Sequence, residues 1–147
     1  MIRIFVDANI LVALVNKEFP VYNYASRLVS LPASAFKLYT SPICLAIAFY
    51  FAEKKSGSKA AKQKMQILCN YIDIAEADKQ AVQNALANKR ISDFEDGLEY
   101  YAALNSKCKF IITEDKTDFN FSDIEVHDSR QFLELYFDRI VKSRNSN

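Results

Sequence analysis

The chain has 147 residues, of which half are hydrophobic and a quarter are charged, and its net charge is +1 at pH 7. This balance predicts one globular domain with a substantial core and excludes a disordered or fibrous protein. The near-neutral charge gives no global attraction to a polyanion, so a nucleic-acid partner would depend on local basic patches and on metal. No apolar run is long enough to span a bilayer and no secretion signal is visible, so we expect a cytoplasmic protein without membrane contact.

Short apolar strands and amphipathic helices alternate along the chain. In chain order we expect strand 2–6, helices 8–15 and 21–31, strand 36–40, helix 43–53, a helix ending near 70, strand 71–74, helices 76–88 and 93–107, strands 110–113 and 124–126, and helix 131–141. This order predicts an α/β sandwich around a mainly parallel sheet of four to five strands. We place a single domain over 1–141 and a frayed tail over 142–147.

The cysteines do not suggest a metal site. Cys44, Cys69 and Cys108 are scattered without C-x-x-C spacing, and the single His127 has no neighbouring ligand pattern. A zinc site or a disulfide framework is therefore not expected. Buried free thiols are the simpler interpretation, because free cysteine is among the most buried residue types.

The opening strand runs directly into Asp7. Such a short apolar strand is typical of a parallel sheet that is covered on both faces, and ligands bind beyond the carboxyl ends of these strands. Asp7 could therefore belong to a ligand site, or it could simply cap the helix that follows, where Asp is favoured. Its position alone favours neither interpretation.

Further aspartates lie on two other segments. Asp115 and Asp118 follow the expected strand 110–113, and Asp93 and Asp96 lie in the first turn of the helix that the S-x-x-E pattern from Ser92 opens. Helical geometry of about 100° per residue groups Glu95, Glu99 and Ser106 on a polar side and Phe94, Leu98 and Tyr101 on an apolar side. Asp96 belongs to neither side. It could serve the helix dipole, although its orientation favours a functional carboxylate.

Carboxylates crowded at one sheet edge repel one another unless a cation neutralises them. Hard oxygen ligands without His or Cys indicate Mg²⁺ or Mn²⁺. Such an ion suits phosphodiester hydrolysis, because it lowers the pKa of the attacking water and stabilises charge on the phosphate.

Four segments together resemble a PIN domain, a family in which many members are the toxins of VapBC-type toxin–antitoxin pairs. These segments are the opening strand with Asp7, the Ser41-Pro42 helix start, 93–96 and 113–119. The resemblance implies a three-layer α/β/α sandwich and a Mg²⁺- or Mn²⁺-dependent ribonuclease that acts on RNA. It also implies a homodimer and an antitoxin partner.

The resemblance also implies roles for individual residues. Asp7, Asp96 and Asp115 take the metal and catalytic positions. Asp118 either contacts the metal indirectly or is an alternate ligand. Asp93 becomes an auxiliary acid, whereas Asn9 and Thr113 support the site.

One position departs from the family pattern. The pattern carries a glutamate early in the helix after the second strand, where this chain has an apolar residue near Ile47. Glu53 lies about 120° around that helix, and Glu99 is expected to face solvent. We therefore expect one acid fewer than usual and a weaker case for a second metal.

Three functions follow from these residues. The leading one is a metal-dependent endoribonuclease, and the alternative is a catalytically weak or inactive PIN-like module that binds RNA or protein. A haloacid-dehalogenase-like phosphatase would need an acid where Asn9 stands.

The densest basic region of the chain comprises Lys54, Lys55, Lys59, Lys62 and Lys64. It could be a solvated helix face, or it could steer the RNA backbone.

Overall fold

The computed structural model of this chain, described for residues 1–145, is built on a five-stranded sheet. The strands are ordered β3-β2-β1-β4-β5 and every pairing is parallel. They comprise β1 (Ile2–Val6), β2 (Phe36–Thr40), β3 (Asp73–Ile74), β4 (Phe110–Ile112) and β5 (Glu125–His127). The predicted α/β sandwich is therefore confirmed, with a sheet that is parallel throughout.

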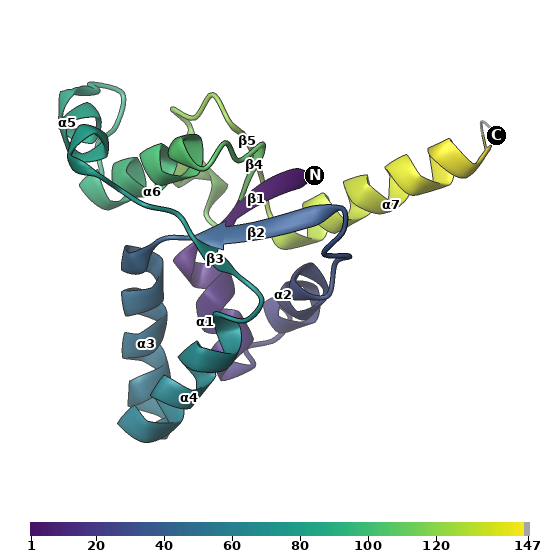
Figure 1. The fold of residues 1–147 in the computed structure, drawn as a ribbon, viewed down its shortest axis with the longest axis horizontal. Helices are drawn as coiled ribbons and strands as arrows, with labels where there is room; N and C mark the ends of the chain where they lie inside the picture. The colour runs from purple at the N-terminus through teal and green to yellow at the C-terminus, as the bar shows by residue number, and fades with distance from the viewer. Residues whose placement is uncertain (146–147) are drawn as a thin grey trace.

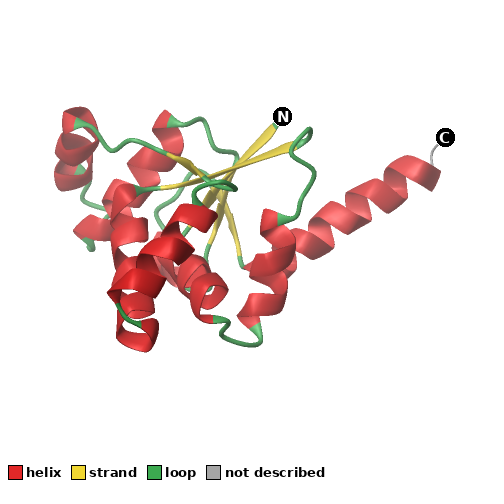
Figure 2. Cartoon of the chain, turned by 60° about the horizontal axis from the view of Figure 1, so that its bottom comes forward, coloured by secondary structure: helices red, strands yellow, loops and turns green. Residues whose placement is uncertain are grey.

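Helices cover both faces of the sheet, which gives three layers (Figures 1 and 2). On one side lie α1 (Ala8–Asn16), α2 (Val21–Val29), α3 (Pro42–Ser56) and α4 (Ser58–Leu68), and on the other lie α5 (Lys79–Ala87) and α6 (Phe94–Asn105). The last helix, α7 (Ser129–Asn145), packs against α2 and then runs away from the sheet (Figure 1).

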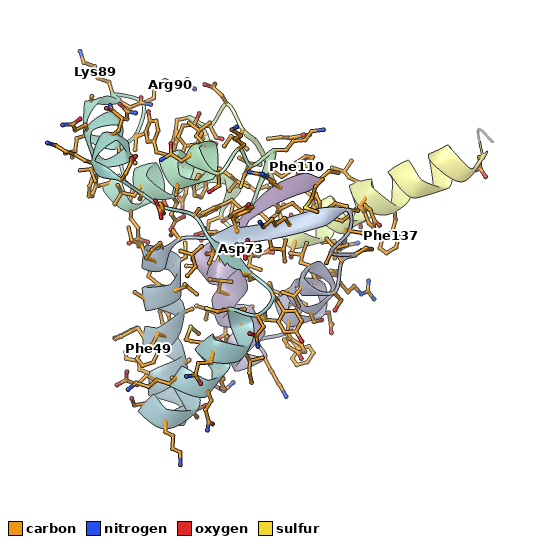
Figure 3. The ribbon with its side chains drawn as sticks, in the orientation of Figure 1. Phe49, Asp73, Lys89, Arg90, Phe110 and Phe137 are labelled. Atoms are coloured by element: carbon orange, nitrogen blue, oxygen red, sulfur yellow. The ribbon has the colours of Figure 1, made fainter. Side chains whose placement is uncertain are left out.

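The core forms around the central strand because β1 has a neighbouring strand on each side and helices on both faces. Ile4, Phe5 and Val6 are at most 2% exposed. Phe110 from the adjacent β4 lies inside the molecule, whereas Lys89 and Arg90 point outward from the α5–α6 connection (Figure 3). The continuous apolar sequence of β1 thus reflects burial on both faces, as a covered parallel sheet requires.

Several predicted bounds need correction. The polar loop after β4 contains a short 3-10 helix, η1 (Lys116–Phe119), and α7 continues to Asn145 rather than ending near residue 141. Of the predicted frayed tail, residues 146–147 lie outside the described residues. Cys44 and Cys108 are buried as expected, but Cys69 is exposed, because it follows the last turn of α4 on the surface.

Within residues 1–145, no helix is both long enough and apolar enough to cross a membrane.

Candidate active site

A cleft of about 410 Å³ opens at the carboxyl edge of the sheet. The register places Val6 of β1 beside Ile112 of β4, so the segments that follow these two strands emerge together. The first turn of α6 faces the same cleft. Its lining includes all four predicted metal residues and two further acids, in full Asp7, Glu18, Glu95, Asp96, Asp115 and Asp118.

Asp7 both caps α1 and lines the cleft. It caps α1, with Oδ1 accepting a hydrogen bond from Ala8 N at 2.6 Å. Its other oxygen, Oδ2, accepts from Thr113 Oγ1 at 2.8 Å and from Asn9 Nδ2 at 3.4 Å. The carboxylate is therefore fixed in place while it still lines the cleft, although it is only 8% exposed.

Thr113 and Asn9 connect Asp7 to the loop after β4. Thr113 Oγ1 accepts from Asn9 Nδ2 at 3.1 Å and from Asp115 N at 3.1 Å. Asn9 Oδ1 accepts from Glu114 N at 3.2 Å. The two residues thus connect Asp7 to the loop that carries Asp115, and Asn9 stands where a haloacid-dehalogenase-like phosphatase would need an acid.

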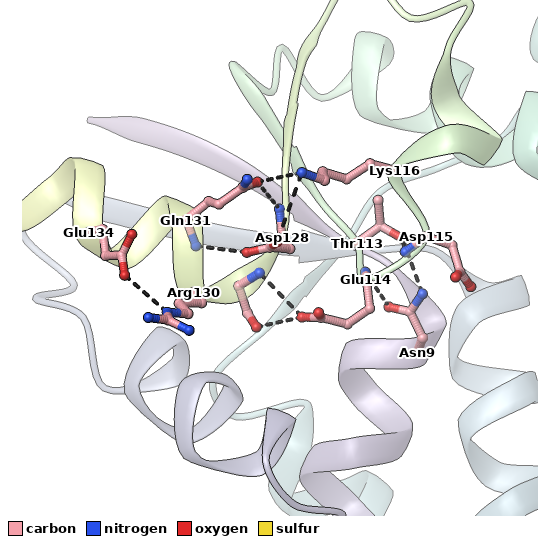
Figure 4. A network of polar contacts seen from close by, with 10 residues as sticks. Asn9, Thr113, Glu114, Asp115, Lys116, Asp128, Arg130, Gln131 and Glu134 are labelled. Atoms are coloured by element: carbon pink, nitrogen blue, oxygen red, sulfur yellow. Dashed lines mark hydrogen bonds and ion pairs between the residues drawn. The ribbon is translucent and has the colours of Figure 1, made fainter.

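The loop after β4 is also tied to the start of α7 (Figure 4). Glu114 Oε1 accepts from Ser129 Oγ at 2.5 Å, and Lys116 Nζ donates to Gln131 Oε1 at 2.8 Å. The segment carrying Asp115 is therefore held from two directions, by α1 through Asn9 and by α7.

Asp93, rather than Ser92, caps α6. Its Oδ1 accepts from Glu95 N at 2.9 Å and from Asp96 N at 3.4 Å. Both Asp and Ser favour the N-cap, so the sequence pattern could not distinguish these neighbours. The bond to Asp96 N fixes the backbone of the turn that points Asp96 into the cleft.

Burial and mutual repulsion perturb the carboxyl groups of the cleft. Burial, followed by the charges of Asp93, Asp118 and Asp7, raises the pKa of half-buried Asp96 to about 7. The pKa values of Glu95 and Asp118 are raised too, first by burial and then by neighbouring acids. Such acids are held near one another at an energetic cost that a bound cation would relieve.

Glu99 does not face solvent as predicted. It is 1% exposed, and its Oε1 accepts a hydrogen bond from Cys44 Sγ at 3.2 Å. Burial, and next the charge of Asp7, raises the pKa of Glu99 to about 10. Burial also raises the pKa of the Cys44 thiol well above its usual range. The expectation that Glu99 faces solvent is therefore wrong, although Glu99 does not line the aspartate cleft.

The error concerns the predicted sides of α6. Phe94, assigned to the apolar side, is 44% exposed, whereas Leu98 is buried and Tyr101 half-buried. The helix contacts α5, α3 and β2, so its middle turns are enclosed on several sides. One signal did point to Glu99, because it lies three residues after Asp96 and hence about 60° from it around the helix.

The two sets of donors differ in spacing. Among the described residues, one group of three has ligand atoms all within 4.8 Å of one another, namely Asp7, Cys44 and Glu99. The four cleft aspartates are more open. Within the part of the chain that the structure describes, they form no group as tight as the first one. Ile47 lines the cleft where the family pattern carries a glutamate.

Comparison with known proteins agrees with this fold. A curated relative named Ribonuclease VapC1, from Aquifex aeolicus, is 29% identical over 139 residues and matches 91% of this chain and 95% of its own. The VapBC-1 structure from nontypeable Haemophilus influenzae superposes with a TM-score of 0.68 at 19% identity, over 88% of this chain and 99% of that one. The Mycobacterium tuberculosis toxin VapC20, described as cleaving the sarcin–ricin loop, gives a TM-score of 0.58 at 20% identity, over 74% and 86%.

A family model described as PIN domain matches residues 3–117, a span that includes most of β1, the Ser41-Pro42 helix start, the first turn of α6 and the loop after β4 as far as Thr117. The chain therefore belongs to the PIN domain family.

Proposed function

We propose that this protein is a Mg²⁺- or Mn²⁺-dependent endoribonuclease that hydrolyses RNA phosphodiester bonds. The observation that carries the proposal is the convergence of Asp7, Asp96, Asp115 and Asp118 from three separate segments on one cleft. The relative named Ribonuclease VapC1 supports the reaction, and the oxygen donors support the metal.

Each aspartate of the cleft has a role in the proposed metal site. Asp7, Asp96 and Asp115 are the metal ligands, with Asp118 as an alternate ligand beside Asp115. When bound, the ion activates water and stabilises charge on the phosphate. Thr113 and Asn9 hold the Asp7 carboxylate, and the Asp93 cap holds the turn that presents Asp96.

RNA would approach along α3 and α4. Lys54 lies three residues after Phe51 of the cleft lining, and Lys59 and Lys62 are exposed on α4. These side chains could neutralise backbone phosphates, so their contribution should weaken with added salt.

Cleavage of a labelled RNA with Mn²⁺ or Mg²⁺ tests the function. We expect metal-dependent cleavage by the wild type and loss of at least about 100-fold in Asp7→Asn and Asp96→Asn, because each loses a charged metal ligand. Asn also caps helices well, so Asp7→Asn should remain folded. Glu125→Gln, on the exposed edge strand β5, is the matched control. Wild-type protein without metal-dependent cleavage, or Asp→Asn variants with wild-type rates, would contradict the proposal.

A catalytically weak or inactive PIN-like module is the second candidate. It is favoured by one observation, the apolar Ile47 in the cleft lining. Ile47→Glu separates the two candidates. If the wild type is a weak enzyme that lacks this ligand, the variant should cleave faster, whereas an efficient enzyme should gain nothing.

Partners and location complete the proposal. The structural relatives include a solved toxin–antitoxin complex from Klebsiella pneumoniae, and we propose an antitoxin partner, a homodimer and a cytoplasmic location for this chain. Light scattering on the purified protein tests the dimer, for which the expected mass is twice that of one chain. Co-expression with the product of a small adjacent gene, followed by purification and an RNA cleavage assay, tests the antitoxin.

A further inference from the structure

A second group of metal-binding side chains lies behind the cleft, deeper in the molecule. Asp7 belongs to both groups, and here its companions are Cys44 from the first turn of α3 and Glu99 from the middle of α6. Cys44 is 0% exposed and Glu99 is 1% exposed. Neither residue lines the aspartate cleft, so this inner group is a separate feature.

One atom of the inner group lacks a partner. Glu99 Oε2 is buried and accepts no hydrogen bond, while Oε1 accepts one from the Cys44 thiol. Within the described residues, no lysine or arginine forms an ion pair with Asp7 or Glu99. A buried carboxyl oxygen without a donor is costly, and here it lies in a group whose other members are also metal ligands.

The distances suit a small cation held by a thiolate. Cys44 Sγ lies 3.2 Å from Glu99 Oε1 and 3.9 Å from Asp7 Oδ1. With metal–sulfur bonds of about 2.3 Å and metal–oxygen bonds of about 2.0 Å at tetrahedral angles, sulfur and oxygen ligands lie about 3.5 Å apart. The two distances fall on either side of that value, so small side-chain adjustments would complete the site.

We propose that Asp7, Cys44 and Glu99 form an inner binding site for a thiophilic divalent cation of the Zn²⁺ class. A thiolate with two carboxylates favours zinc or cobalt, whereas Mg²⁺ prefers oxygen donors alone. Cys44 binds as the thiolate and Glu99 as the carboxylate, and the protons of both groups pass to solvent. Asp7 links the two sites, because Oδ1 faces Cys44 while Thr113 and Asn9 hold Oδ2. The proposal does not depend on RNA cleavage.

Titration of the metal-free full-length protein with Co²⁺ tests the inner site without RNA. Cobalt replaces zinc in thiolate sites and produces a sulfur-to-metal absorption band in the near ultraviolet. We expect that band to saturate at one equivalent in the wild type and to be absent from Cys44→Ser and Cys44→Ala. Glu99→Gln keeps the thiol but loses a ligand, so its cobalt affinity should fall at least about tenfold.

Matched variants separate the inner site from other thiols and from the cleft. Cys69→Ser removes the exposed thiol and Cys108→Ser the other buried one, and both should keep the band. Asp96→Asn should keep the band while losing RNA cleavage. Circular dichroism establishes that the Cys44 variants are folded, and zinc competition against a chromogenic chelator gives a second measure of affinity in Glu99→Gln.

Two outcomes would overturn the inference: no sulfur-to-cobalt band in the wild type, or a band that disappears with Cys69→Ser and persists in Cys44→Ser. Either result leaves Mn²⁺-dependent RNA cleavage by the aspartate cleft unaffected. Conversely, a Cys44-dependent band in a protein that cuts no RNA supports the inner site and contradicts only the proposed function.

Discussion

Thr113 is the residue that joins the two halves of the aspartate cleft. Its hydroxyl donates to Asp7 Oδ2 and accepts from Asn9 Nδ2 and Asp115 N, which uses the one donor and both acceptor positions of a hydroxyl group. Because the side chain is 0% exposed, water cannot replace these contacts. Thr113 therefore sets the position of Asp7 relative to Asp115 without itself reaching the cleft.

Replacing Thr113 by Val should misplace both aspartates. The valine keeps the shape of threonine but removes all three hydrogen bonds, so we expect RNA cleavage and Mn²⁺ affinity to fall together by about 10–100-fold, as for groups that orient metal ligands. Thr113→Ser keeps the hydroxyl and should retain most of both. Cleavage rates and Mn²⁺ calorimetry measure the effect. Equal values for Thr113→Val and the wild type in both assays would contradict it.

For single residues, the sequence predicted which aspartates follow the strands but did not predict the inner group of Asp7, Cys44 and Glu99. Asp7 and Asp115 follow apolar strands of a parallel sheet, and such strands meet at one edge. Glu99 was misplaced because a helical projection separates polar from apolar sides but does not show which neighbouring elements enclose them. Here α3 brings Cys44 to the polar side of α6, a contact between residues 55 positions apart.

Among the helices, α6 packs closely against its neighbour at a glycine. Gly97 lies where α6 approaches α5, and a Cβ added there would stand 3.1 Å from Ala85 Cβ and 3.0 Å from Ile91 Cγ2. A side chain at this position would require Ala85 and Ile91 to shift by a few tenths of an ångström, so glycine permits the close packing of α6 against α5. The bounds of β1 and β2 matched the predicted strands because apolar, β-branched and aromatic residues dominate both. The start of α6 did not match, since two adjacent residues can each cap.

The position of that cap can be tested by removing each candidate. Asp93→Ala should lower the free energy of unfolding by about 1 kcal/mol, because the amide groups of Glu95 and Asp96 lose their acceptor. Ser92→Ala should change it by less than about 0.5 kcal/mol, as for an ordinary surface substitution. Asp93→Asn keeps a capping oxygen and is the matched control. Urea denaturation measures all three. A larger loss of unfolding free energy in Ser92→Ala than in Asp93→Ala would show that Ser92 is the cap, as the sequence pattern predicted.

At the scale of the whole molecule, the raised carboxyl pKa values make stability depend on pH. The pKa of Asp96 rises from 3.8 to about 7, and that of Glu99 from 4.5 to about 10. Between the ordinary and the raised pKa of each group, the metal-free folded protein binds more protons than the unfolded chain. The contribution of Asp96 and Glu99 to stability is therefore largest below about pH 4 and falls as the pH rises.

We therefore expect the metal-free protein to lose stability between pH 5 and pH 8, with a slope of at most about 1.4 kcal/mol per pH unit for each such group. Urea denaturation at several pH values measures the slope. Glu99→Gln should make it shallower, because glutamine does not titrate. Saturating Mn²⁺ should restore stability at pH 8, since a cation binds the ionised folded form. Stability that rises over this range in the metal-free wild type would contradict the expectation.

The central position of β1 has a consequence for the order in which the cleft can be assembled. β1 lies between β2 and β4, and β4 begins only at Phe110. The bond from Thr113 to Asp7 closes a separation of 106 positions, a long-range contact that cannot form while the chain is short. A nascent chain that already carries Asp7 and Asp96 therefore still has an open sheet edge and no Asp115. The cleft is therefore complete only after β4 and the loop that carries Asp115 have joined β1.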